Sequence, residues 1–250
     1  MARSGSQSVE RALAVLQCIA EADGDIGVSE IGGRCGLSVS TAHRLVQALR
    51  APGLVSQDQR SERYRLGPGA VALGRRAELR LGVSRLEPHL RDRLAACTGE
   101  SITLGTRLGN EMLVVSHIPS SHPLRVGHPP GMRVPLHASA IGKVLLAFTP
   151  DRSAEIAALG PLIAYTDATI TDHAALLKEV TTTWQRGWAK NDGERDVGVR
   201  SIAAPLRNPD GTAWAGVAVQ GPSARLPDDR LDELVDVLLQ VAQQMASEIV

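Results

Sequence analysis

The chain has 250 residues, enough for one or two domains with buried cores, and its 27 basic and 27 acidic side chains give a formal net charge of zero. This balance excludes a strong overall basic field of the kind that attracts nucleic acids. The three cysteines have no C-x-x-C spacing, which argues against a disulfide framework or a zinc ribbon.

The charges are unevenly distributed along the chain. Residues 1–80 contain 11 Arg and 8 acidic residues, a net charge of +3, whereas residues 81–250 contain 16 basic and 19 acidic residues, a net charge of −3. This asymmetry weakly favours a DNA-binding N-terminal part. No signal-peptide core and no apolar run of membrane-spanning length is present, so we expect a cytoplasmic protein with no membrane partner.

The first 80 residues predict four helices and a hairpin. Ser8 is expected to cap the first helix, Ser29 a short second helix that ends at Gly36, and Ser38 a third helix that runs to about residue 51. The segment LVSQDQRSERYRL reads as two short strands around a polar tip, and helical spacing returns from Gly67 to about residue 80.

The remaining chain mixes strands and helices. A helix over 84–97 has a stripe of Leu86, Leu90 and Leu94, and two β-rich runs follow, SITLGTRL and MLVVSHI, separated by Gly109, Asn110 and Glu111. Further strands are expected at 201–207 and 213–220, and helices at 139–148, 172–186 and 228–249. We therefore predict an α+β chain with a domain over 1–66, a linker helix over 67–82, and a second domain over 83–250 with an antiparallel sheet and flanking helices.

Residues 29–49 have the order of a helix-turn-helix, in which the longer helix enters the major groove of DNA. Arg can bind guanine and Gln can bind adenine, while hydroxyls at a helix start can hold a phosphate and arginines of a hairpin can lie beside the backbone or in the minor groove. The predicted DNA-binding residues are Ser38, Ser40, Thr41, His43, Arg44, Gln47, Arg60, Arg63 and Arg65. The alternative is a small three-helix domain with a polar face. Gly32 and Gly33 fit a helix poorly, at about 1 kcal/mol each relative to Ala.

Three enzyme readings of the second domain fail on spacing. The run AIGKV lacks the earlier glycine and the following Ser or Thr of a phosphate-binding loop, since His137 and Val144 stand there. The four histidines between His117 and His137 follow no metal-ligand pattern, and no G-x-S-x-G turn surrounds Ser139. We expect no catalytic residue, no metal and no cofactor, and hence no enzyme.

Several runs together resemble the IclR family of bacterial regulators. The most telling are STAHRL and RYRLGP, and the likeness continues through HPLRVGHPPGMRVPLHASAIGKVLLAF, RGWAKNDGERDVGVRSIAAPL and VAVQGP. Departures are Gly32 and Gly33, where the family usually has better helix formers, and Asn191, where an acidic residue is common. The resemblance implies a GAF-like second domain that binds a small effector, often a carboxylate or an aromatic acid. It places the effector-binding residues at Val126, Ala140, Ile141, Asn191, Ser201, Ala218 and Gln220.

The combined expectation is a regulator that binds double-stranded operator DNA as a homodimer or homotetramer and responds to a small-molecule effector. The resemblance favours a repressor over an activator. The charged run DGERDVGV could close the pocket as a lid or could be a solvated turn. The main alternative is a ligand-independent DNA-binding protein whose second domain only oligomerises, and a more distant one is an enzyme fused to a DNA-binding module.

Overall fold

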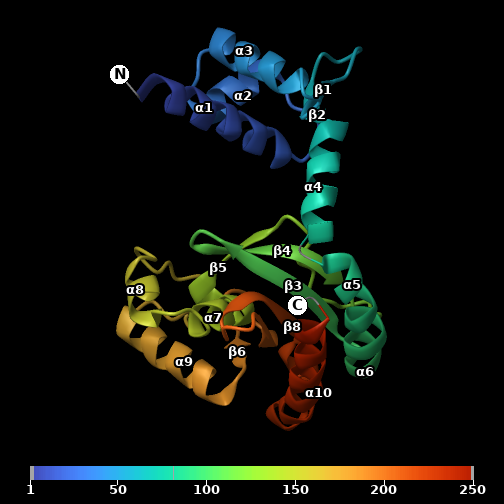
Figure 1. The fold of residues 1–250 in the computed structure, drawn as a ribbon, viewed down its shortest axis with the longest axis vertical. Helices are drawn as coiled ribbons and strands as arrows, with labels where there is room; N and C mark the ends of the chain where they lie inside the picture. The colour runs from blue at the N-terminus through green and yellow to red at the C-terminus, as the bar shows by residue number, and fades with distance from the viewer. Residues whose placement is uncertain (1–2, 81, 249–250) are drawn as a thin grey trace. The chain divides into compact units, whose positions relative to one another are not determined.

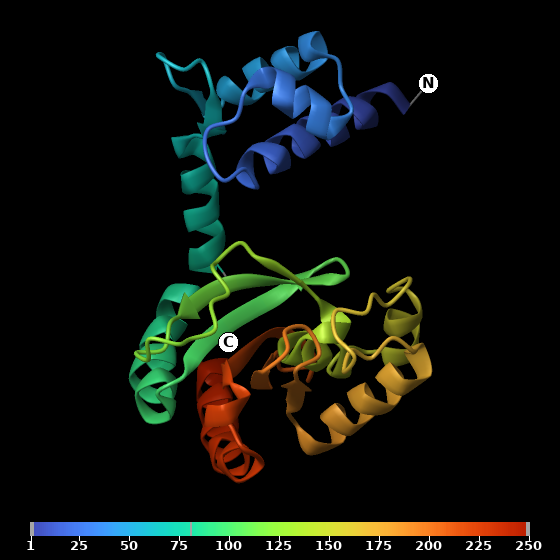
Figure 2. The same cartoon turned by 180° about the vertical axis from the view of Figure 1, so that it is seen from behind.

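The computed structural model describes residues 3–80 and 82–248, and the chain divides into two compact units between residue 81 and Gly82 (Figures 1 and 2). Each unit has its own core, so each is described by itself. Within the described ranges, no helix is long and apolar enough to cross a membrane.

The first unit consists of three helices, a two-stranded hairpin and a fourth helix. The elements are α1 (Arg3–Ala20), α2 (Val28–Cys35), α3 (Val39–Arg50), β1 (Val55–Gln57), β2 (Tyr64–Leu66) and α4 (Pro68–Arg80). β1 pairs antiparallel with β2, and Tyr64 packs into the core among residues of α1, α2 and α3. This is the predicted winged helix-turn-helix order.

Two of the predicted helix starts are wrong. α1 begins at Arg3, so Ser8 lies inside the helix. α2 begins after Gly27, without a side-chain cap, and Ser29 lies inside it. The reason is tertiary, because Ile26 forms a β-bridge with Tyr64 and turns the chain into α2 directly behind it. The Ser38 cap of α3 is confirmed, since its hydroxyl accepts a hydrogen bond from the Thr41 backbone N–H.

The two glycines of α2 differ in their surroundings. A Cβ at Gly32 would lie 3.0 Å from the Leu37 carbonyl oxygen, because α2 closely approaches the turn into α3. A Cβ at Gly33 would meet nothing within 4 Å. Close packing therefore accounts for Gly32, and the structure gives no account of Gly33. The helix ends where Gly36 adopts the left-handed conformation at φ 63°.

The second unit is built on a six-stranded antiparallel sheet with the order β5-β4-β3-β8-β7-β6. Its strands are β3 (Ser101–Leu108), β4 (Glu111–Ile118), β5 (Arg133–Pro135), β6 (Ala189–Asp192), β7 (Val199–Arg207) and β8 (Ala213–Pro222). Four of these, β3, β4, β7 and β8, match the predicted strands. β5 and β6 were not predicted, because three or four residues are too few to show a period.

Helices cover both faces of this sheet (Figure 2). The helical run α5 (Val83–Pro88), a π-helical stretch (His89–Ala95) and α6 (Ala96–Thr98) replaces the single helix predicted over 84–97, and its Leu86, Leu90 and Leu94 are buried as predicted. The other helices are α7 (Ala140–Ala147), α8 (Arg152–Ala157), α9 (His173–Arg186) and α10 (Asp228–Ser247).

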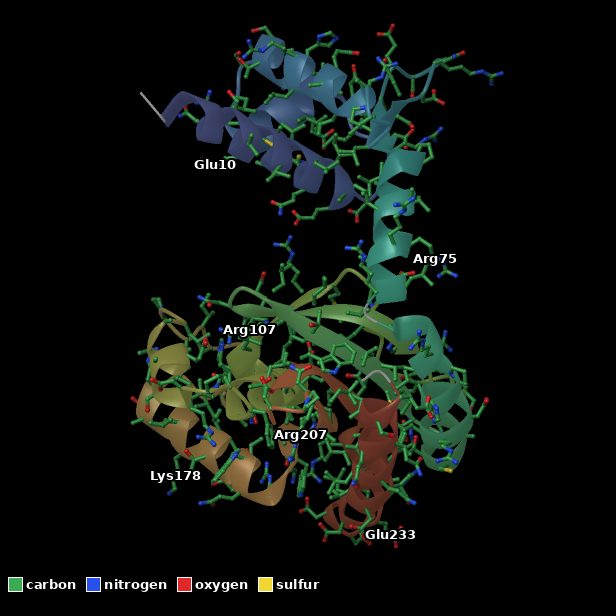
Figure 3. All side chains as sticks on the ribbon, in the orientation of Figure 1. Glu10, Arg75, Arg107, Lys178, Arg207 and Glu233 are labelled. Atoms are coloured by element: carbon green, nitrogen blue, oxygen red, sulfur yellow. The ribbon has the colours of Figure 1, made fainter. Side chains whose placement is uncertain are left out.

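Strand alternation separates the two faces. On β7, Ala203 belongs to the apolar cluster around α7, whereas its neighbours Ile202 and Ala204 are buried on the opposite side. Side chains fill the space between the sheet and the helices (Figure 3). Ser201, two residues before Ala203, therefore shares the α7 face of the sheet.

Candidate functional site

The outward face of α3 carries the polar residues that the sequence assigned to DNA. The inward face is buried, as its spacing predicts, and consists of Ala42, Leu45, Val46 and Leu49. Ser40, His43 and Arg44 are exposed on the other side. Arg44 makes no hydrogen bond or ion pair with any residue in the described part of the chain, so its guanidinium can meet an external partner without giving one up.

Gln47 is held by its neighbours on the same helix. Its Nε2 lies 3.3 Å from His43 Nε2, and its Oε1 accepts a hydrogen bond from Arg50 Nη1 at 2.9 Å. Gln47 must release both contacts before its amide can bind an adenine edge with two hydrogen bonds. Base reading by Arg44 therefore needs less rearrangement. Arg50 is an exposed cation on this helix that the sequence analysis did not single out.

The hydroxyls at the start of α3 hold one another. Ser38 Oγ lies 2.8 Å from Thr41 Oγ1 and 3.2 Å from Ser40 Oγ, and it accepts from the Thr41 backbone N–H at 3.3 Å. This arrangement fixes the first turn of the helix. A phosphate at this position would share the hydroxyl protons with the existing network.

Two of the three hairpin arginines are already paired. Arg63 Nε donates to the Asp25 carbonyl oxygen at 2.6 Å, and its Nη2 lies 3.3 Å from Glu30 Oε2. Arg65 Nη1 lies 3.4 Å from Asp25 Oδ2. The guanidinium of Arg60 is exposed and has no partner within the described ranges. Arg60 can bind a phosphate directly, whereas Arg63 and Arg65 would exchange one anionic partner for another.

In the second unit, a pocket lies between α7 and the sheet. Its lining atoms border about 430 Å³ of space, part of which is open to solvent. Six of the seven predicted effector-binding residues line it: Ala140, Ile141, Asn191, Ser201, Ala218 and Gln220. The lining residues that were not predicted are Thr103, Met112, His128, Val134, Ala138, Ser139, Arg195, Asp196 and Val199.

Val126, the seventh predicted residue, lies outside this pocket. Its carbonyl oxygen accepts a hydrogen bond from Ser101 Oγ at 2.9 Å, which holds the segment at the end of the sheet. Val126 lines an adjacent, more open hollow instead. His128, Arg195, Asp196 and Val199 border both the hollow and the pocket, so these residues separate one from the other.

The polar residues beside α7 differ in how many hydrogen bonds their side chains already make. Asn191 Nδ2 donates to the Ala138 carbonyl oxygen at 2.7 Å, and Asn191 Oδ1 accepts from the Glu194 backbone N–H. Ser139 caps α7, accepting from the Gly142 N–H at 2.8 Å. Ser201 is nearly buried, and its hydroxyl bonds to no described residue. Ser201 is therefore the polar group beside α7 that is most available to a ligand.

A chain of hydrogen bonds crosses the other end of the pocket. Arg195 Nη1 lies 3.1 Å from His128 Nε2, and His128 Nδ1 lies 2.9 Å from Gln220 Oε1. Gln220 Nε2 donates to Thr103 Oγ1 at 2.8 Å, and Thr103 Oγ1 lies 3.2 Å from His117 Nδ1. Burial lowers the pKa of both His117 and His128 below the usual histidine value, and neighbouring positive charge lowers the pKa of His128 further through Arg195.

The segment that carries Arg195 is anchored on its other side by a buried ion pair. Lys143 of α7 contacts the carboxylate of Glu194 and donates to the Lys190 carbonyl oxygen at 2.9 Å. Thr169 Oγ1 also donates to the Glu194 carbonyl oxygen. Burial raises the pKa of Glu194, and Lys143 opposes part of that rise. Within the segment DGERDVGV, Glu194 is buried, whereas Asp192, Asp196, Val197 and Gly198 are exposed.

The features considered for enzyme chemistry have structural explanations. A Cβ at Gly142 would lie 2.1 Å from the Leu136 carbonyl oxygen, so the glycine of AIGKV allows α7 to pack on the preceding turn. His137 is hydrogen-bonded to the Ile163 carbonyl oxygen at 3.0 Å. Across residues 3–80 and 82–248, no three His, Cys, Asp or Glu side chains come together as metal ligands.

Both units match models of known domain families. Residues 8–59 match the IclR helix-turn-helix domain, and residues 80–247 match the C-terminal domain of bacterial transcriptional regulator IclR.

Individual proteins match over nearly the whole chain. The HTH-type transcriptional regulator BhcR of Paracoccus denitrificans is 36% identical over 97% of this chain and 87% of its own length. The HTH-type transcriptional repressor AllR of Escherichia coli K12 is 29% identical over 99% of this chain and 92% of its own length. An IclR homologue from Microbacterium hydrocarbonoxydans, crystallised with 4-hydroxybenzoate, has the same fold at 24% identity, with a TM-score of 0.83 over 97% of this chain and 98% of that one.

Proposed function

Because the chain belongs to the IclR family of bacterial transcriptional regulators, which are DNA-binding proteins and not enzymes, we propose that it is a repressor whose operator binding is modulated by a small organic acid. One observation carries the proposal: six residues that are spread from Ala140 to Gln220 in the sequence line one pocket, in a unit separate from α3. The relative AllR, which is named as a repressor, supports the repressor part of the proposal. The homologue crystallised with 4-hydroxybenzoate supports the acid-binding part.

The DNA-binding half rests on α3 and the hairpin. Arg44 and Arg60 are exposed cations without partners within the described ranges, and the buried face of α3 fixes the direction in which Arg44 points. Arg44 would read guanine and Arg60 would bind the backbone. The proposed sites for operator and effector lie on separate units, so the proposed modulation of DNA affinity by the acid is an allosteric one.

The proposed assembly is a homodimer or homotetramer. α1 exposes Val9 and Leu13, and α4 exposes Val71, Leu73 and Leu79, each more than half accessible. Such apolar surface on helices is typical of faces that pair with another copy. A dimer of winged domains reads a palindromic operator, with half-sites spaced by the dimer. Sedimentation under reducing conditions should show at least a dimer at micromolar concentration.

The test combines DNA selection with ligand screening. Random DNA selected on the protein should yield one palindromic sequence, and a panel of organic and aromatic acids should include at least one that raises Tm, because a ligand of the folded state stabilises it. That acid should change the affinity for the selected DNA.

Ser201→Leu is the matched variant for this test. The larger side chain fills the pocket and removes a hydroxyl, so the response to the acid should be lost while DNA binding without acid persists. If no acid changes Tm or DNA affinity, the second unit serves only oligomerisation, which is the competing function. If Ser201→Leu loses DNA binding and keeps acid binding, Ser201 serves assembly.

A further inference from the structure

Arg195 is a cation with few partners at the boundary of the pocket. Its side chain is 22% exposed, and its Nη1 contacts are His128 Nε2 at 3.1 Å and Asp196 Oδ2 at 3.7 Å. A guanidinium has five N–H donors and no acceptor, so most of this group's hydrogen-bonding capacity is unused. Among the described residues that line the pocket, no other carries a permanent positive charge.

The presence of Arg195 fixes the direction of the whole hydrogen-bond chain. Arginine can only donate, so His128 Nε2 must be an unprotonated acceptor, and its proton lies on Nδ1, which donates to Gln220. Gln220 then donates to Thr103, and the Thr103 hydroxyl donates to His117 Nδ1. The contact between Arg195 and His128 therefore requires a neutral His128.

The contact between Arg195 and His128 lies at the boundary through which a ligand would enter the pocket. Arg195 and His128 border both the open hollow and the narrow pocket, so a ligand passing from one to the other meets them first. A carboxylate placed there can accept hydrogen bonds from both side chains. While His128 Nδ1 continues to donate to Gln220, this requires a second proton, on His128 Nε2. Charge-assisted hydrogen bonds of this kind are the strong ones.

We propose that the effector is a carboxylic acid whose carboxylate binds between Arg195 and His128, and that His128 takes up one proton at Nε2 when it binds. This inference rests on the proposed function, and it names the residues that recognise the acid and the proton that accompanies it. The reaction is balanced: neutral His128, the carboxylate and one proton from solvent give the imidazolium–carboxylate pair. No bond other than N–H is formed.

The charges around His128 support this exchange. The loop after β6 places Arg195 and Asp196 near the ring, β4 contributes His117, and Arg125 from the preceding segment acts on His117. In the free protein, burial and Arg195 keep the pKa of His128 below its usual value. A bound carboxylate offsets the charge of Arg195 and accepts the new N–H, which raises the pKa of His128. Between the two pKa values, affinity should rise up to about tenfold for each unit by which pH falls.

Calorimetry with defined acids tests the proposal. The probes are glycolate, benzoate and 4-hydroxybenzoate, each compared with its uncharged amide, titrated at about pH 6 and about pH 8 in buffers of different ionisation enthalpy. At least one acid should bind more tightly at the lower pH, with uptake of about one proton, and its amide should bind far more weakly.

Three variants separate the roles. His128→Gln keeps an acceptor for Arg195 and a donor for Gln220 but cannot take up the proton, so binding should become independent of pH. Arg195→Gln should weaken the acid about tenfold or more and leave the amide unaffected. His122→Gln, which changes an exposed histidine outside the chain of hydrogen bonds, should behave as the unmodified protein does.

The outcomes distinguish this inference from the proposed function. If an acid binds with no proton uptake, or equally well to Arg195→Gln, the acid group lies elsewhere in the pocket and the inference is wrong while the acid sensor stands. If none of the three acids binds at millimolar concentration, both the inference and the acid class of the effector fail. Unchanged pH dependence in His128→Gln assigns the proton to another group and overturns the inference.

Discussion

Replacing Lys143 with Met tests how the loop that carries Arg195 is held. The Lys143 side chain is 1% exposed and that of Glu194 10% exposed, so the pair lies almost entirely out of water. Lys143→Met retains an unbranched apolar stem, one atom shorter, but leaves the Glu194 carboxylate without its counter-charge. The Lys190 carbonyl oxygen also loses its hydrogen bond.

The expected cost follows from the burial of the pair. Removing one partner of a buried ion pair typically destabilises a protein by about 3–5 kcal/mol. We expect about 3 kcal/mol at neutral pH, because burial already raises the pKa of Glu194 and the stranded carboxylate can take up a proton. Proton uptake by the folded variant also means that its loss should shrink as pH falls. Lys143→Met combined with Glu194→Leu removes both charges and should recover at least about 2 kcal/mol of that loss.

Urea unfolding followed by tryptophan fluorescence measures this directly, because Trp184, Trp188 and Trp214 all lie in the second unit. Lys190→Met is the matched control. Lys190 pairs with the exposed Asp228 at 2.7 Å, and such surface pairs contribute about 1 kcal/mol or less. A loss below about 1 kcal/mol for Lys143→Met would contradict the expected cost, as would a double variant whose loss equals the sum of the single losses.

Three further outcomes are expected. Arg44→Ala should lower affinity for the selected operator by about 1–3 kcal/mol and leave affinity for random DNA unchanged. Arg63→Ala should weaken binding to all sequences only modestly, because Arg63 is already paired with Glu30. If Arg44→Ala loses equal affinity for both DNAs, Arg44 does not read bases. Gly33→Ala should stabilise the first unit by up to about 1 kcal/mol in thermal unfolding, whereas Gly32→Ala, whose Cβ meets backbone, should not. The free protein should lose stability as pH falls below 6.5, because the depressed pKa values of His117 and His128 favour their neutral forms in the folded state. A flat stability profile between about pH 5 and 7 would contradict this.

The regular elements of the fold were predictable from sequence because they repeat a pattern. α3 shows four buried residues at helical spacing, and the β3–β4 hairpin shows alternation around Gly109 and Asn110. The start of α2 was not predictable, because it depends on Ile26 pairing with Tyr64, 38 positions away in the chain. The role of Gly32 was hidden for the same reason, since the atom that a Cβ would meet belongs to the next turn.

The candidate pocket was predicted only in part. The resemblance to a family supplied Ala140, Asn191 and Ser201, and the structure places them together. It supplied Val126 as well, which lines the neighbouring hollow because its backbone is held by Ser101. Nothing in the local sequence distinguishes these positions from ordinary strand or helix residues.

Arg195 shows why the charged end of the pocket could not be predicted from sequence. Arg195 lies in a run with four other charged residues, and only the fold gives them different roles. Glu194 contacts the buried Lys143, and Asp192 pairs with Arg200 at 2.6 Å. Arg195 contacts His128. Consecutive side chains in an irregular loop have no period, so no spacing rule assigns them directions. The buried anchor at Glu194 fixes the loop, and that anchor determines the direction of the next residue. A polar side chain in a loop gains a defined position through such contacts with the rigid elements around it, which here are α7 and the sheet.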